Sequence, residues 1–114
     1  GEDTALVCFD VIKEKAISQK LKSELTGSDK AVIDISIDQM KNFLGNALEV
    51  RSKNDEKYLL MSETAENSLT VEQKKLIQNR VNLLSFHIPT IEKYGGGSVR
   101  CMLAEIFLNK KGLK

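Results

Sequence analysis

The sequence predicts an α/β chain made of two similar halves, and three observations support this prediction. Apolar runs of strand length alternate with stretches whose apolar residues recur at helical spacing. With 114 residues, 41% of them hydrophobic and 29% charged, the chain has the size and composition of one soluble globular domain. A segment of the first half also aligns without a gap on a segment of the second half.

The first half is predicted to contain a strand, a long helix, a strand, a short helix and a strand. Its first run, TALVCFDVI, is apolar and partly β-branched, and the next stretch places Ile17, Leu21 and Leu25 at helical spacing. Gly45 is expected to stop the short helix. The predicted elements span residues 4–12, 13–25, 31–37, 38–45 and 46–52.

A polar link at residues 53–56 leads to the second half, where the same order is expected. Thr70 followed three positions later by Gln73 forms a capping box, which is typical of the start of a helix. Pro89 is expected to break the chain before a helical turn. The predicted elements are a strand at 57–62, a helix at 71–81, a strand at 83–88, a helical turn at 90–94 and a long strand at 98–108.

Charge and composition exclude several classes of function. A net charge of +1, with no basic stripe, gives nucleic acid no electrostatic foothold. No apolar run is long enough to cross a bilayer, and the N-terminal stretch does not resemble a signal peptide. Two cysteines, Cys8 and Cys101, and one histidine make neither a disulfide framework nor a zinc site. We therefore expect a cytoplasmic protein with free thiols, no metal or cofactor, and no nucleic-acid or membrane partner.

The aligned segments indicate an internal duplication. Residues 37–50 align on residues 88–101, which places Phe43 over Tyr94 and Gly45 over Gly96. A period near 50 residues predicts two α/β units, at about 4–52 and 56–108, that pack side by side within a single domain of residues 1–114. The two segments differ most at two places, where the second has three consecutive glycines and, four positions later, a cysteine.

Three interpretations of the glycines and Cys101 compete. A phosphate-binding loop would use the glycines to present backbone N–H groups, but no phosphate-loop motif is present. In a purely structural interpretation the glycines allow a tight bend and Cys101 is a small core residue. In a catalytic interpretation the glycines form an open floor beside a nucleophilic thiolate. Arg100, as a strand neighbour, would point to the opposite face from Cys101.

Three segments carry a resemblance to a known family: ISIDQMKNFLGNALEV, LLMSETAENSLTVEQ and above all IPTIEKYGGGSVRCMLAEIFL. They resemble the C-terminal part of amidinotransferase-like, deiminase-like proteins of the citrulline-hydrolase type in the guanidine-modifying superfamily, the penteins. The resemblance implies a fold of five ββαβ-type units around a central active site, of which this chain would hold about two. It implies attack of a cysteine thiolate on a guanidino or ureido carbon, with a covalent thiouronium-type intermediate.

The resemblance also assigns residues. Cys101 matches the nucleophile, and Gly95, Gly96, Gly97 and Ser98 would form the floor of the site. The catalytic histidine and the substrate-binding carboxylates belong to units that would precede this chain, so the chain is expected to be a C-terminal fragment that lacks enzyme activity by itself. It would associate with the missing N-terminal part or form a homo-oligomer. The alternative is a non-catalytic interaction or assembly module that has kept the motif.

Other polar residues receive structural interpretations. His87, the only histidine, is expected to be an exposed or hydrogen-bonded strand residue and not the general base. Cys8 lies within an apolar strand and is expected in the core. Asp34 and Glu49 are expected to be solvated carboxylates. Asn46 either holds a turn through its side chain or lines the site, and the turn is the favoured interpretation.

Overall fold

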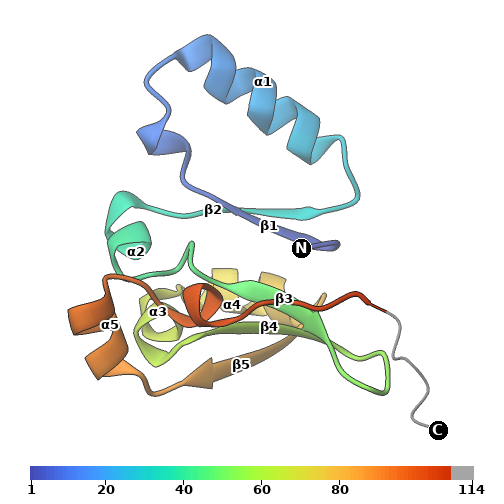
Figure 1. Ribbon diagram of the computed structural model, residues 1–114. Coiled ribbons are helices and arrows are strands. Elements are labelled where there is room, and N and C mark those ends of the chain that lie inside the picture. Colours follow the sequence, from blue (N-terminus) through green and yellow to red (C-terminus); the bar gives the residue numbers. More distant parts are fainter. Residues whose placement is uncertain (109–114) are drawn as a thin grey trace, which may run out of the picture.

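The computed structural model describes residues 1–108, and it confirms a mixed α/β chain with two small sheets (Figure 1). The first sheet pairs β1 (Thr4–Val7) with β2 (Ala31–Asp34) in parallel. The second has the order β3-β4-β5, with β3 antiparallel to β4 and β4 parallel to β5. Its strands are β3 (Leu48–Arg51), β4 (Lys57–Ser62) and β5 (Asn82–Phe86).

Each parallel pair is joined by a helical crossover. Between β1 and β2 lie a short 3₁₀ turn, η1 (Phe9–Val11), and α1 (Lys15–Thr26). Between β4 and β5 lie α3 (Glu63–Ser68) and α4 (Val71–Gln78). The remaining elements are α2 (Ile37–Lys41), which leads to β3, α5 (Pro89–Gly95), and the 3₁₀ turn η2 (Val99–Met102).

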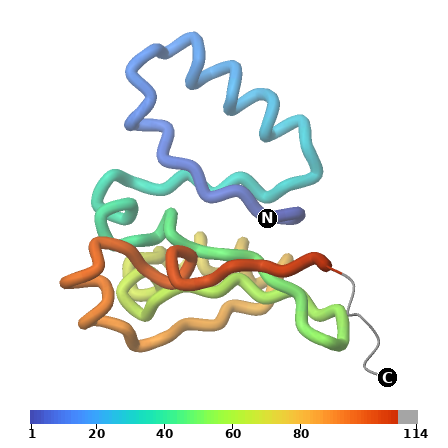
Figure 2. The backbone as a smooth tube through the Cα atoms, viewed as in Figure 1, coloured from blue at the N-terminus to red at the C-terminus, as the bar shows by residue number. Residues whose placement is uncertain are grey.

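The core lies between the three-stranded sheet, α3, α4 and the second strand of the small sheet. Ile33 from β2 and Ile77 from α4 are almost fully buried there, together with Met61 from β4. Helix α1, in contrast, buries none of its residues fully and leaves Ile17 53% exposed. Figures 1 and 2 show why, because β1, α1 and β2 form a layer of their own, with α1 on the outer side. The apolar stripe of α1 is therefore incompletely covered within residues 1–108.

Two capping boxes bind the halves of the chain together. The predicted box of Thr70 and Gln73 opens α4, and a second box, formed by Ser36 and Gln39, opens α2. The two glutamines contact each other, since Gln39 Nε2 donates to Gln73 Oε1 at 2.6 Å. Gln73 Nε2 also donates to the carbonyl of Asp34 at 2.8 Å. The capping side chains of α2 and α4 thus hold these two helices and β2 against one another.

Several predicted bounds are corrected by the structure. The first strand ends at Val7, so Cys8 lies between β1 and η1, and α3 was not predicted although Ser62 caps it. Helix α2 ends at Lys41, and the left-handed residue after it is Phe43, with φ of 64°, not Gly45. The predicted strand at 98–108 is wrong, because η2 is followed by chain without a ladder partner among residues 1–108. An apolar run can form a strand only where another strand pairs with it.

None of the helices within residues 1–108 combines the length and apolar character required to span a membrane.

Candidate functional site

The site is centred on Cys101, which lies in η2 with its side chain exposed. Its backbone N–H donates to the carbonyl of Ser98 at 3.1 Å, which closes the 3₁₀ turn. Its Sγ accepts a hydrogen bond from Asn46 Nδ2 at 3.0 Å. Because the thiol is exposed, the interpretation of Cys101 as a core residue is wrong. Cys8 is the buried thiol, as predicted, with 9% exposure.

The three glycines have three different environments. Gly95 is the last residue of α5, and Gly96 follows it in the left-handed conformation, with φ of 66°. A Cβ added to Gly97 would lie 3.0 Å from Cys101 Sγ and 3.1 Å from Cys101 Cβ. Real Cβ atoms essentially never approach other heavy atoms more closely than this. Any side chain at position 97 would therefore press on the thiol, whereas Gly96 is required for its backbone conformation.

Ser98 is fully buried and supports the site from beneath. Its Oγ donates to Glu92 Oε1 at 2.8 Å, and Thr64 Oγ1 donates to the other carboxylate oxygen at 2.7 Å. Burial raises the pKa of Glu92, but three hydroxyl hydrogen bonds outweigh burial and hold the pKa below its ordinary value. These hydroxyls belong to Ser62, Thr64 and Ser98. The buried carboxylate of α5 thus links the start of η2 to α3.

Asn46 comes from the first half of the chain, in the loop between α2 and β3. The favoured interpretation, a turn held by its side chain, is wrong: the amide bonds to Cys101, and the backbone N–H makes the local bond, to the Phe43 carbonyl at 2.8 Å. The hydrogen bond from Asn46 is the main cause that lowers the pKa of the Cys101 thiol below its ordinary value. The turn at Ser98 and the charge of Arg100 lower it further.

The chain matches the model of one protein family. The model of eukaryotic N,N-dimethylarginine dimethylhydrolases matches residues 1–108, a range that includes Asn46, the glycines and Cys101. The chain belongs to this family. The match also supports membership in the pentein superfamily, which the three resembling segments had indicated. No curated protein and no solved structure gives a significant match to the chain.

The histidine and carboxylates that the sequence resemblance implies for catalysis are not bonded to Cys101 within residues 1–108. His87 lies just beyond β5, 75% exposed at its side chain, and its Nδ1 is 2.7 Å from Glu63 Oε2. Asp34 is exposed at the end of β2. The sole side chain in this range that hydrogen-bonds the sulfur is Asn46. The same range contains no group of three histidine, cysteine or acidic side chains suited to a metal ion.

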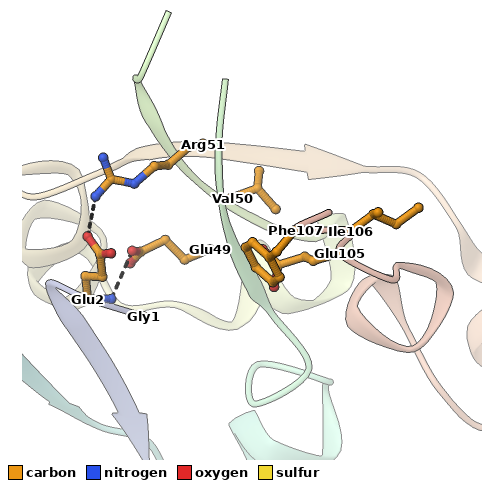
Figure 3. A pocket seen from close by; sticks show the side chains of 8 residues that line it. All are labelled: Gly1, Glu2, Glu49, Val50, Arg51, Glu105, Ile106 and Phe107. Carbon is orange, nitrogen blue, oxygen red and sulfur yellow. Dashed lines mark hydrogen bonds and ion pairs between the residues drawn. The ribbon is translucent and has the colours of Figure 1, made fainter. Parts of the chain in front are cut away.

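Glu49, expected to be solvated, is half-buried and lines a hollow of about 510 Å³ (Figure 3). Its Oε1 accepts a hydrogen bond from the Glu2 backbone at 2.9 Å, and Glu2 also pairs with Arg51. The hollow separates β3 from residues 105–107, so it lies along the segment that follows the thiol. An apolar groove of about 180 Å³ lies against η2, lined by Leu60, Phe86, Ile88, Val99, Met102 and Leu103.

Proposed function

We propose that this chain carries the nucleophile of a cysteine-dependent hydrolase that acts on methylated arginine, with Cys101 as the nucleophile and residues 95–98 as the floor of the site. The observation that supports this proposal best is the exposed Cys101 sulfur, which is hydrogen-bonded by Asn46 and lies where an added Cβ on Gly97 would approach it to 3.0 Å. Membership in the dimethylarginine dimethylhydrolase family supports the substrate class, so we favour methylated arginine over citrulline.

The reaction proceeds in two steps. The Cys101 thiolate attacks the central guanidinium carbon and forms a C–S bond, and the bond from that carbon to the dimethylated nitrogen then breaks. The leaving nitrogen takes a proton and departs as dimethylamine, which leaves a covalent thiouronium-type intermediate. Water then attacks the same carbon, loses a proton and displaces the thiolate. The products are citrulline and dimethylamine, with no net oxidation or reduction.

We further propose that the chain, as two units at about 4–52 and 56–108, supplies one part of this site and that another part supplies the general base and the carboxylates. Within residues 1–108 neither kind of group is bonded to the sulfur. Cytoplasmic location fits this proposal, because a reducing compartment keeps an exposed thiol in its reduced form.

The surface of the chain supports association with that other part or with a second copy. Residues 103–108 follow η2 with no ladder partner in the described chain, and Ile106 and Phe107 are at least 80% exposed. Apolar area of this kind marks a contact surface. Size-exclusion chromatography with light scattering, at micromolar concentration, is expected to give a mass above 12.7 kDa for the chain alone, or a complex with the N-terminal part. A single species of 12.7 kDa that unfolds independently of concentration contradicts this proposal.

The decisive test of the function measures citrulline released from N,N-dimethylarginine by the protein expressed from its complete reading frame. We expect Cys101→Ser to abolish turnover and Cys8→Ser, the control thiol, to leave it close to that of the parent protein. The covalent intermediate should be trapped on the Cys101 peptide by acid quenching and mass spectrometry. Absence of turnover in the parent protein as well as in Cys101→Ser would support the alternative of a non-catalytic module, and unchanged turnover in Cys101→Ser would contradict Cys101 as the nucleophile.

A further inference from the structure

We infer that Asn46 is a positioning residue for the Cys101 nucleophile, and that its amide stabilises the thiolate and holds the sulfur over Gly97. This inference rests on the proposed function of Cys101. It concerns a residue of the first half of the chain acting on a nucleophile of the second half, since the two are 55 positions apart. The distance from Asn46 Nδ2 to Cys101 Sγ is 3.0 Å.

The loop that carries Asn46 is held in place by contacts that do not involve the thiol. Leu44 is fully buried and Ala47 is nearly so, which anchors the chain on both sides of Asn46. Phe43 holds the left-handed conformation that ends α2, and its carbonyl accepts the Asn46 backbone N–H. A donor mounted on a preorganised loop stabilises an anion without further reorganisation.

The oxygen of the Asn46 amide argues against the view that this side chain serves only to stabilise the fold. Asn46 Oδ1 is buried and has no hydrogen-bond partner within the described residues. A buried carbonyl oxygen without a donor costs stability, so a residue retained only to hold a turn would be expected to satisfy it. The one side-chain hydrogen bond that Asn46 makes is the bond to sulfur.

No other side chain in the described part of the chain hydrogen-bonds the sulfur, although a backbone hydrogen bond at Ser98 also lowers the pKa of the thiol, less than Asn46 does. Arg100, beside Cys101 in η2, acts only through its charge and lowers the pKa of the thiol less than Asn46 does. His87 is paired with Glu63, and Glu92 accepts hydrogen bonds from the hydroxyls of Ser98 and Thr64. The amide itself does not titrate, so it donates to the sulfur across the whole pH range in which the thiol ionises.

The test follows the rate at which iodoacetamide alkylates Cys101 as a function of pH, measured on the Cys101 peptide by mass spectrometry. The variants are Asn46→Ala, which removes the donor, and Asn46→Asp, which has the same shape but places an anionic oxygen near the sulfur. The matched control is Asn42→Ala, because the Asn42 amide donates at 2.9 Å to the Asp38 carbonyl and does not reach the thiol.

We expect Asn46→Ala to slow alkylation at pH 7 by roughly threefold to tenfold, and Asn46→Asp to slow it more, because each raises the thiol pKa. All rates should converge above the thiol pKa, where every variant is ionised. Such convergence distinguishes loss of thiolate stabilisation from a change in access. Asn42→Ala should keep the parent profile.

Two outcomes contradict the inference: a parent-like pH profile for Asn46→Asp, or a folded state lost in Asn46→Asp, which would show a structural role. Cys8 serves as the internal marker of folding, since it stays protected only while the core is intact. A shifted profile combined with full turnover of Cys101→Ser would instead refute the proposed function and leave the Asn46 contact standing. The two failures are therefore distinguishable.

Discussion

The segments after the two short helices, α2 and α5, were aligned by sequence but differ in structure. After α2 the chain forms β3, and Val50 on β3 lies opposite Tyr58 in an antiparallel ladder. After α5 the chain forms η2, and Cys101 is exposed with no ladder partner. The left-handed residue is Phe43 in the first segment and Gly96 in the second. Helix α5 has seven residues and α2 has five, so the left-handed position falls on a glycine only in the second.

This difference shows how one arrangement of elements yields a structural strand in one place and an accessible thiol in the other. A strand ladder fixes both edges of the backbone and turns alternate side chains away from the solvent. A 3₁₀ turn after flexible glycines has no such constraint, and Gly97 removes the side chain that would cover the sulfur. Asn46 then supplies from the first segment the donor that the second lacks.

The largest expected effect concerns the chain alone. Because nucleophile, base and carboxylates act as a unit, the 114-residue chain should turn over N,N-dimethylarginine at least roughly a thousandfold more slowly than a typical enzyme, whose rate is on the order of 10 per second. Citrulline formation by the purified chain is the measurement. A rate on the order of 1 per second, lost in Cys101→Ser, would mean that the second segment holds a complete site, with His87 as the candidate base.

The next effect compares the two thiols. Limiting iodoacetamide at pH 7 should label Cys101 on the order of a hundredfold faster than Cys8, because Cys8 must wait for local opening of the core. Peptide mapping of the folded chain measures both rates in one sample. Labelling of Cys8 first, or of both thiols only in denaturant, would show that η2 does not expose its cysteine.

A third prediction tests the glycine floor. Gly97→Ala places a Cβ 3.0 Å from Cys101 Sγ, so the sulfur must shift, and we expect alkylation of Cys101 to slow by about fivefold. Gly45→Ala is the matched control from the first segment, because an added Cβ there meets nothing within 4 Å. Equal rates for both variants would contradict a steric role for Gly97.

The smallest effect concerns the support beneath η2. Glu92→Gln should lower the free energy of unfolding at pH 7 by about 1–3 kcal/mol, because it weakens a buried hydrogen-bonded carboxylate. The folded-state pKa of Glu92 lies below the unfolded value, so its contribution is present above the unfolded pKa and is lost as the pH falls through the folded pKa. Urea titrations at pH 7 and pH 3 should therefore show a smaller gap between parent and variant at pH 3. A constant gap would mean that Glu92 acts without its charge.

Local signals in the sequence predicted most of the elements but not their tertiary partners. The capping box at Thr70, Pro89 at the start of α5 and the apolar run of β4 each depend on neighbouring residues, and each was found as predicted. Helix α3 was missed although Ser62 begins a capping pattern followed by acidic residues. Its signal was available, since acidic side chains are favoured in the first turn of a helix.

The candidate site was predicted only in part, for a physical reason. Cys101 and the glycines were selected from a local pattern and a family resemblance, both of which the sequence contains. The contact with Asn46 joins residues 55 positions apart and depends on how β3 and β4 pair, which no local pattern records. The predicted strand at 98–108 failed similarly, because an apolar run does not say whether a partner strand is present.

The Asn46 contact also has a consequence for the order of folding. Contacts between distant parts of the sequence form only after the loop between them has closed. The bond between Asn46 and Cys101 closes such a loop. In the unfolded chain Cys101 therefore has the acidity of an ordinary thiol, and its thiolate is favoured only once both halves have docked. The unfolded chain thus has two thiols of ordinary acidity, and folding makes them differ by burying Cys8 and bonding Cys101 to Asn46.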